Sequence, residues 1–115
     1  MSNILKLESG PSAETAAVVF AALGDQQRLW LVSRLCHGGP RSITQLASGA
    51  RISRQAVTKH LRVMEDAGLV RSARRGRERV WQLEQRRLEQ ARRYLSQIST
   101  QWDAILEKLR AFVEA

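Results

Sequence analysis

The segment 53–70, SRQAVTKHLRVMEDAGLV, carries five polar or basic side chains on one side of a predicted helix: Arg54, Gln55, Thr58, Lys59 and Arg62. Their guanidinium, amide, hydroxyl and ammonium groups are of the kind that contact phosphates and the edges of bases in the major groove. On the other side, Val57, Leu61 and Met64 recur after four and three residues, which is typical of the buried face of an α-helix. The polar side must therefore face water or a partner.

Positive charge is concentrated in the part of the chain that contains this helix. The protein has 115 residues and a formal net charge of +8. Residues 41–79 hold ten lysines and arginines against three acidic residues, whereas the rest of the chain holds nine against eight. Such a local excess predicts binding to an anionic polymer such as nucleic acid. A membrane surface is a poorer match, because no amphipathic helix with large apolar anchors coincides with the basic stretch.

Two helices are expected to precede this region. Residues 1–11 end in Gly-Pro and predict a flexible N-terminal arm, and one domain is expected over residues 12–115. The first helix should run from Ser12 to the breaker at Gly24. Its apolar face comprises Ala16, Val19, Phe20 and Leu23. Asp25 should cap the second helix, which ends at the HGGP breaker. The apolar face of that helix comprises Leu29, Val32, Leu35 and Cys36.

Two further helices are expected to form a helix-turn-helix. Ser42 and Gln45 have the spacing of a capping box at the start of a short helix. A turn over residues 49–52 follows, and Ser53 is a natural N-cap for a helix over residues 53–67. Two helices joined by a short turn, the second with a polar and basic face, are typical of this motif.

The segment 70–83 is predicted to form a β-hairpin with its turn at Arg75-Gly76. Four arginines lie near its tip: Arg74, Arg75, Arg77 and Arg79. A hairpin of this kind is suited to lie along a DNA backbone or to reach into a minor groove, as a wing does. The alternative is a solvated hairpin whose arginines only prevent edge-to-edge pairing.

One long helix is expected from residue 85 to residue 114. Its apolar residues follow steps of three and four without interruption, at Leu88, Ala91, Leu95, Ile98, Trp102, Ile105, Leu109 and Phe112. This is the heptad pattern of a coiled-coil-like contact. A helix of this length spans roughly 45 Å, which is more than a domain of this size can cover, so a second copy is the expected partner. The alternative is a helix that folds back over its own core.

Other functions lack their sequence signatures. The single cysteine, Cys36, excludes an internal disulfide framework. No apolar run approaches the roughly 18 residues of a membrane span, and the N-terminus lacks a signal-peptide pattern, so a cytoplasmic setting is expected. No nucleophile-base set, paired carboxylates or glycine-rich phosphate loop is evident, so we expect neither enzyme activity nor a cofactor.

Four segments, FAALGDQQRLWLVSRL, ITQLA, SRQAVTKHLRVMEDAGLV and RRGRERVWQL, carry a resemblance to a known family. From about Ala16 to Val113 the chain resembles the ArsR/SmtB-like winged-helix transcriptional repressors. The resemblance implies a homodimer that binds an operator near its own promoter and represses until an inducer of unknown identity arrives. It implies that the first and last helices form the dimer. The residues expected there are Phe20, Leu88, Leu95, Ile98, Trp102, Ile105, Leu109 and Phe112.

Several members of this family sense metals, but this chain lacks their ligand patterns. The metalloid sensors carry a Cys-x-Cys pair near the third helix, where this chain reads SITQLASGA. The zinc-type sensors carry histidine and carboxylate ligands on the last helix, whereas the histidines here are His37 and His60. We therefore expect no metal site, and we expect His60 to be a packing or helix-anchoring residue. The chain resembles the subgroup without a metal site.

The sequence predicts a mainly α-helical winged helix-turn-helix protein with a small β-hairpin and a long C-terminal dimerisation helix. A homodimer would read an inverted-repeat operator in double-stranded DNA, with helix 53–67 in the major groove and hairpin 70–83 on the backbone or minor groove. The residues expected to contact DNA are Ser42, Arg51, Ser53, Arg54, Gln55, Thr58, Lys59, Arg62, Arg74, Arg75, Arg77 and Arg79. The alternative is a protein-interaction module that uses the long helix, for which scattered positive charge is expected.

Overall fold

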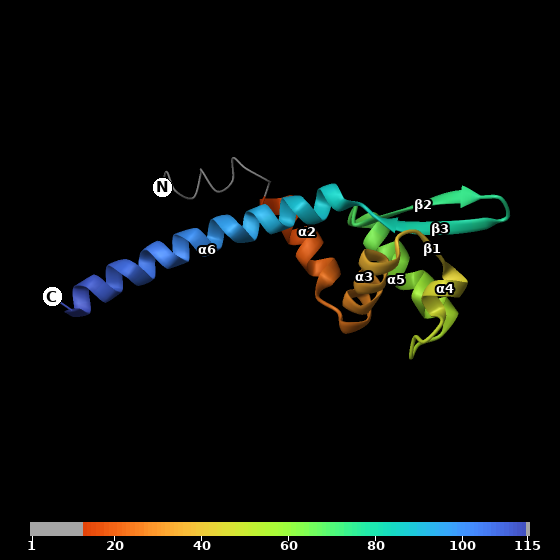
Figure 1. Ribbon diagram of the computed structural model, residues 1–115, viewed down its shortest axis with the longest axis horizontal. Coiled ribbons are helices and arrows are strands. Elements are labelled where there is room, and N and C mark those ends of the chain that lie inside the picture. Colours follow the sequence, from red (N-terminus) through yellow and green to blue (C-terminus); the bar gives the residue numbers. More distant parts are fainter. Residues whose placement is uncertain (1–12, 115) are drawn as a thin grey trace.

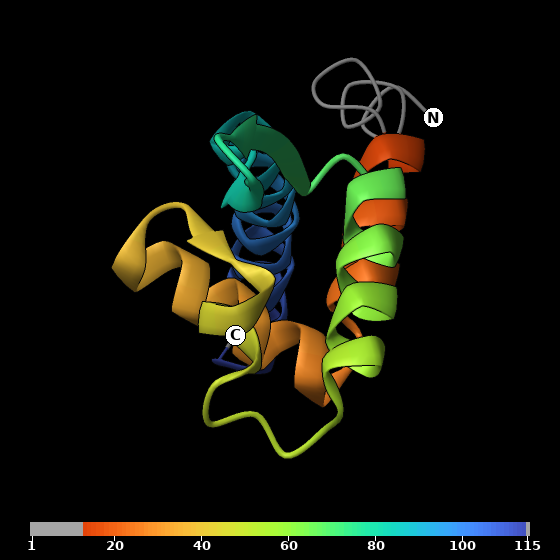
Figure 2. The ribbon, with the colours of Figure 1, turned by 90° about the vertical axis from the view of Figure 1, so that its right-hand side faces the viewer.

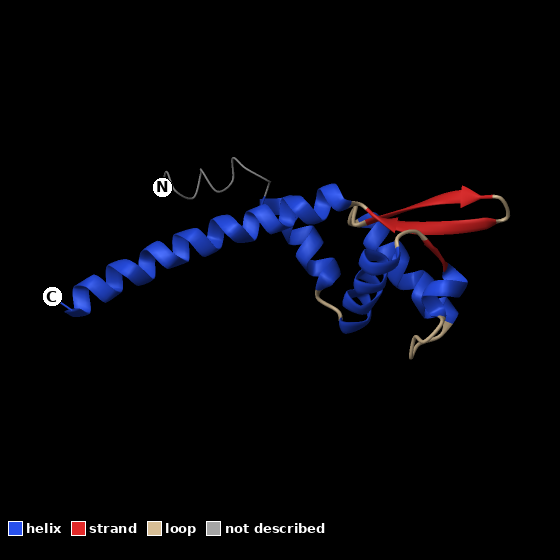
Figure 3. Cartoon of the chain, viewed as in Figure 1, coloured by secondary structure: helices blue, strands red, loops and turns tan. Residues whose placement is uncertain are grey.

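The computed structural model describes residues 13–114. The elements follow in the order α2 (Ala13–Leu23), α3 (Gln26–Gly38), β1 (Arg41–Ser42), α4 (Ile43–Ala47), α5 (Arg54–Asp66), β2 (Val70–Arg75), β3 (Glu78–Leu83) and α6 (Gln85–Glu114). Figures 1 and 3 show a mainly helical protein with one small sheet, which confirms the predicted fold class. The arm predicted at residues 1–11 and the helix start predicted at Ser12 lie outside the described residues.

The strands form one antiparallel sheet in the order β1-β3-β2. Two details differ from the prediction. The two-residue strand β1 was not predicted: Arg41 pairs with Trp81 and Ser42 with Val80, but two residues are too few to show a strand period. The hairpin turn lies at Gly76 and Arg77, one residue later than predicted. Gly76 has a φ of +62°, in the left-handed region. Glycine adopts this conformation readily because it has no Cβ atom.

Helix caps fix where α3 and α5 begin. The Asp25 carboxylate accepts hydrogen bonds from the backbone N–H groups of Gln27 and Arg28, each at 3.0 Å. The N–H of Arg28 is the largest reason why the pKa of Asp25 lies below its usual value. The Ser53 hydroxyl accepts from the N–H of Ala56 at 3.1 Å and so begins α5. Both predicted caps are confirmed, and α6 has the predicted bounds.

The core joins α2, α3, α4 and α5 with the sheet. The predicted apolar face of α5 is confirmed, since Val57, Leu61 and Met64 are fully buried. The predicted face of α3 is wrong in part. Leu31 is fully buried, whereas Leu29 is 52% exposed and Cys36 is also exposed. Apolar residues form two overlapping stripes along α3, one with Leu29 and one with Leu31. Which of the two stripes is buried depends on the elements that pack against α3. The fully buried large side chains are Leu31, Leu46, Leu61, Met64, Leu69, Val19 and Val57.

The long helix α6 gives the described chain its extended shape. The principal-axis extents are 66 × 27 × 20 Å. The first half of α6 packs against α2, and the rest projects away from α4, α5 and the hairpin (Figure 1). Figure 2 views the molecule from the end that carries the hairpin, and it shows α5 alongside α2. The molecule thus has a compact helix-turn-helix end and a single-helix end.

We expect Ser42→Ala to destabilise the protein by about 1 kcal/mol, because Ser42 closes the predicted capping box of α4. Its hydroxyl accepts from the N–H of Gln45 at 3.2 Å, and its own N–H donates to Gln45 Oε1 at 2.9 Å. Urea unfolding at one fixed protein concentration measures the effect. Ser99→Ala makes the same change at an exposed position of α6 and should stay within about 0.5 kcal/mol of the wild type. Equal stability of the two variants would show that the capping box contributes nothing.

Candidate nucleic-acid interface

The outer face of α5 presents the side chains predicted to contact DNA. Arg54, Gln55, Lys59 and Arg62 are exposed, as is the capping residue Ser53. Thr58 is half-buried, and its hydroxyl donates to the Arg54 carbonyl at 3.1 Å, one turn earlier in the helix. This hydroxyl can still accept a hydrogen bond. The structure therefore gathers the predicted donors on one surface of a helix whose other face is anchored in the core.

A hydrogen-bonded network fixes α5 against the start of α3. His60 Nε2 lies 2.8 Å from Gln27 Oε1, and His60 Nδ1 lies 3.2 Å from Arg28 Nη1. A neutral imidazole with its proton on Nε2 satisfies both contacts, donating to Gln27 and accepting from Arg28. Arg28 Nε also donates to the Ala22 carbonyl, and the Asp25 carboxylate lies 4.0 Å from His60. The expected anchoring role of His60 is confirmed, but the partners that hold it were not predicted.

The hairpin forms a second basic surface. Arg74, Arg75 and Arg77 are exposed, and no hydrogen bond or ion pair within residues 13–114 engages their guanidinium groups. Arg79 is also exposed, but its Nη1 donates to Ser72 Oγ at 2.8 Å across the two strands. Three guanidinium groups at the hairpin tip are therefore available to bind phosphates.

A link between the hairpin and α5 orients these two surfaces. Ser72 Oγ lies 3.4 Å from Glu65 Oε2 near the end of α5, in addition to its bond from Arg79. Figure 1 shows α5 and the hairpin at the same end of the molecule, away from the C-terminal end of α6. The exposed positive charges of both elements therefore lie at the same end of the molecule.

Two predicted contact residues lie outside α5 and the hairpin. Arg51 is exposed in the turn before α5. Ser42 is only 6% exposed, and both its hydroxyl and its N–H are used in the capping box. Ser42 thus has little surface left for a DNA contact and chiefly holds α4 in place.

The chain matches known proteins across this same region. The model of a helix-turn-helix domain matches residues 12–73. The uncharacterized HTH-type transcriptional regulator YuzN of Bacillus subtilis is 40% identical over 68 residues, which are 54% of this chain and 74% of YuzN. The HTH-type transcriptional regulator Rv2034 of Mycobacterium tuberculosis is 43% identical over 63 residues, which are 55% of this chain and 58% of Rv2034.

Solved structures define the family more closely. An ArsR-like transcriptional regulator from Rhodococcus sp. RHA1 is 33% identical, with a TM-score of 0.75 over 86% of this chain and 92% of that one. The chain belongs to the ArsR family of transcriptional regulators. The homodimeric winged helix-turn-helix DNA-binding domain Mb0332 of Mycobacterium bovis shares the fold, at 22% identity and a TM-score of 0.61 over 76% of this chain and 80% of that one.

In this ArsR-family chain, the apolar stripe of α6 divides into two parts. Ala91 is buried and Leu88 is half-buried against the chain's own core, so the alternative of a helix folded over its core holds for these two positions. Phe20 is half-buried against the same core. The other six heptad residues are between 41% and 82% exposed: Leu95, Ile98, Trp102, Ile105, Leu109 and Phe112. The ArsR-family chain therefore leaves a long apolar surface uncovered.

The described part of the ArsR-family chain contains neither a cluster of metal-ligating side chains nor a helix that could span a membrane. Within residues 13–114, no group of three or more His, Cys, Asp or Glu side chains is arranged to hold a metal ion. Cys36 and His37 are both exposed at the end of α3, where His37 Nδ1 lies 2.7 Å from the Ser33 carbonyl. None of the helices described is both long and apolar enough to cross a lipid bilayer.

Proposed function

We propose that this ArsR-family regulator is a homodimeric repressor of its own gene that reads an inverted-repeat operator in double-stranded DNA. The observation that carries the proposal is the separation of two surfaces. Exposed positive groups lie on α5 and the hairpin at one end, and the exposed apolar stripe lies on α6 at the other. A protein-interaction module would not need its positive charge on one helix and one hairpin.

Each basic element has its own part in DNA binding. The N-terminal half of α5 enters the major groove, where Arg54 and Gln55 reach base edges and Thr58 and Lys59 reach bases or phosphates. Ser53, Arg51 and Arg62 lie beside this half and contact the backbone. The hairpin arginines lie along the backbone or in the minor groove and supply charge more than sequence discrimination.

The exposed stripe of α6 supports the homodimer. Six large apolar residues at heptad spacing need a covered face, and a second copy offers the same pattern. The Mycobacterium bovis domain that shares the fold is described as homodimeric. A two-fold dimer places its two α5 helices on half-sites that are related by the same symmetry. Such a regulator works in the cytoplasm, binds no metal as cofactor, catalyses no reaction and releases DNA when an inducer binds.

Footprinting on the DNA upstream of the protein's own coding sequence tests this function. We expect protection of two inverted half-sites whose centres lie about one helical turn, or a multiple of it, apart. Addition of the protein to an in vitro transcription reaction should lower the yield from the same promoter. A single protected half-site, uniform coverage without sequence preference, or increased transcription would each contradict a named part of the proposal.

A further inference from the structure

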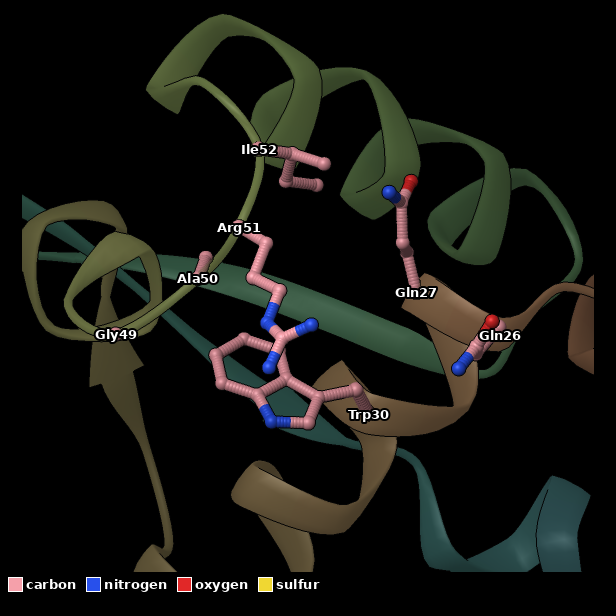
Figure 4. A pocket seen from close by; sticks show the side chains of 7 residues that line it. All are labelled: Gln26, Gln27, Trp30, Gly49, Ala50, Arg51 and Ile52. Atoms are coloured by element: carbon pink, nitrogen blue, oxygen red, sulfur yellow. The ribbon is translucent and has the colours of Figure 1, made fainter.

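A cavity of about 490 Å³ lies between the first turn of α3 and the turn that joins α4 to α5. Gln26, Gln27 and Trp30 line it from α3, and Arg51 and Ile52 line it from the turn (Figure 4). Small-molecule sites occupy about 300 to 1,000 Å³ in proteins. None of the described residues that line this cavity is acidic. The cavity therefore has the size and the charge for a small anion.

Trp30 and Arg51 give the cavity its chemistry. The indole of Trp30 is held by Arg34, whose guanidinium carbon lies 5.0 Å from the ring centroid. In Figure 4 the side chain of Arg51 extends from the turn toward Trp30. No hydrogen bond or ion pair within residues 13–114 engages the guanidinium group of Arg51. An aromatic ring would stack on the indole, and a carboxylate on that ring would form a bidentate pair with the guanidinium group.

A larger groove near the start of α6 is less suited to an anion. It has a volume of about 670 Å³ and contains Arg71 and Arg92. Arg71 Nε lies 3.8 Å from Glu84 Oε2, and Arg92 forms two hydrogen bonds with the Glu89 carboxylate. Because both cations of this groove already have a carboxylate partner, the unpaired Arg51 is the better receptor for an added carboxylate.

The Trp30 cavity is connected directly to α5. Gln27 lines the cavity, and its Oε1 is the atom that faces His60 Nε2 at 2.8 Å. On the other side, Ile52 immediately precedes Ser53, the cap of α5. A molecule in the cavity therefore contacts both the residue that anchors α5 through His60 and the turn from which α5 begins. Displacement of Gln27 or of the turn would therefore act on the contacts that hold α5 against α3.

We propose that this cavity is an effector site for a small planar aromatic carboxylate, and that its occupation lowers the affinity of the protein for operator DNA. The site deepens the proposed function and rests on it, since its effect is exerted on DNA binding. Two physical causes act in the same direction. Arg51 cannot pair with a DNA phosphate and with the effector carboxylate at the same time. In addition, a ligand wedged beside Gln27 disturbs the contact that orients α5.

Calorimetry on the full chain without DNA tests the site separately from the proposed function. We expect 2-naphthoate to bind, and 2-naphthamide and cyclohexanecarboxylate to bind about tenfold more weakly, because each lacks either the charge or the aromatic ring. Arg51→Gln should lower the affinity for 2-naphthoate about tenfold. Trp30→Leu should also lower it, with folding checked by circular dichroism. Arg62→Gln removes an exposed arginine that does not line the cavity and should leave naphthoate binding unchanged.

The coupling to DNA is tested in a second measurement. At a concentration of 2-naphthoate that saturates the wild type but not Arg51→Gln, operator binding by the wild type and by Arg62→Gln should weaken, and operator binding by Arg51→Gln should weaken much less. Absence of naphthoate binding, equal binding of 2-naphthamide, or unchanged binding by Arg51→Gln would overturn the site. Displacement of naphthoate by equimolar inorganic phosphate would also overturn it, because the cavity would then be a contact for a DNA phosphate. Naphthoate binding without any effect on bound operator would overturn the regulatory role alone.

Discussion

Replacing Trp102 and Ile105 together by aspartate is expected to leave the protein monomeric. Both residues lie in the middle of the uncovered stripe and are 58% and 49% exposed in the single chain. In the monomer the new charges would therefore stay in water and cost little. In a dimer they would be buried against the partner without a counter-charge, at a cost of roughly 3 to 5 kcal/mol. The substitution thus acts on association rather than on folding.

Sedimentation equilibrium of the wild type and the variant measures this effect. The matched control is the double substitution Thr100→Asp and Ala104→Asp, which adds the same charge to the same exposed segment of α6. Residues 100 and 104 lie outside the heptad seam, so the control should remain dimeric. A dimer of unaltered stability in the Trp102 and Ile105 variant would show that the stripe has another partner. A monomeric wild type would lead to the same conclusion.

Local signals in the sequence were sufficient to predict the elements that carry the proposed function. Ser53, the spacing of Val57, Leu61 and Met64, and the glycine at 68 predict α5 within a residue of its observed bounds. The heptad spacing likewise predicted the bounds of α6. Each of these signals depends on neighbours within one or two helical turns. Such signals survive in any tertiary context that buries one face of the helix.

Features that depend on tertiary contacts were not predicted. The β1 strand exists only because residues 41 and 42 lie beside β3, far along the chain. The network around His60 joins residues more than 30 positions apart, and hydrogen bonding of this kind leaves no period in the sequence. The heptad pattern also could not show that the chain's own core covers Ala91, because an apolar stripe has the same spacing whether its partner is the same chain or another.

Substitutions in α5 and in the hairpin are expected to affect DNA binding in different ways. Gln55→Ala should weaken binding to the operator while leaving binding to random DNA nearly unchanged. Gln55 is exposed next to the N-terminal end of α5, the end that we propose to enter the major groove. Its amide can pair with an adenine through two hydrogen bonds, and such a pair is worth about 1 to 3 kcal/mol of discrimination. The lost energy should therefore depend on the base sequence.

Arg77→Ala should weaken binding to the operator and to random DNA alike. Arg77 lies in the exposed turn of the hairpin, where we expect its guanidinium group to reach phosphates rather than base edges. Each lost phosphate contact releases one fewer counterion, so the slope of log affinity against log salt should fall by about one per hairpin. Lys108→Ala is the matched control, because it removes one exposed charge in the C-terminal part of α6. The C-terminal end of α6 lies away from α5 and the hairpin (Figure 1).

Salt titrations of the three variants on operator and random duplexes distinguish base-specific contacts from contacts to the DNA backbone. If α5 reads bases, Gln55→Ala reduces the ratio of specific to random affinity and leaves the salt slope unchanged, whereas Arg77→Ala leaves the ratio and reduces the slope. Lys108→Ala should change neither quantity. If Gln55→Ala instead lowered the affinity for every sequence equally, α5 would hold DNA only by contacts to its backbone. The specificity would then have to come from DNA shape or from the hairpin, and the assignment of α5 as the base-reading helix would be wrong.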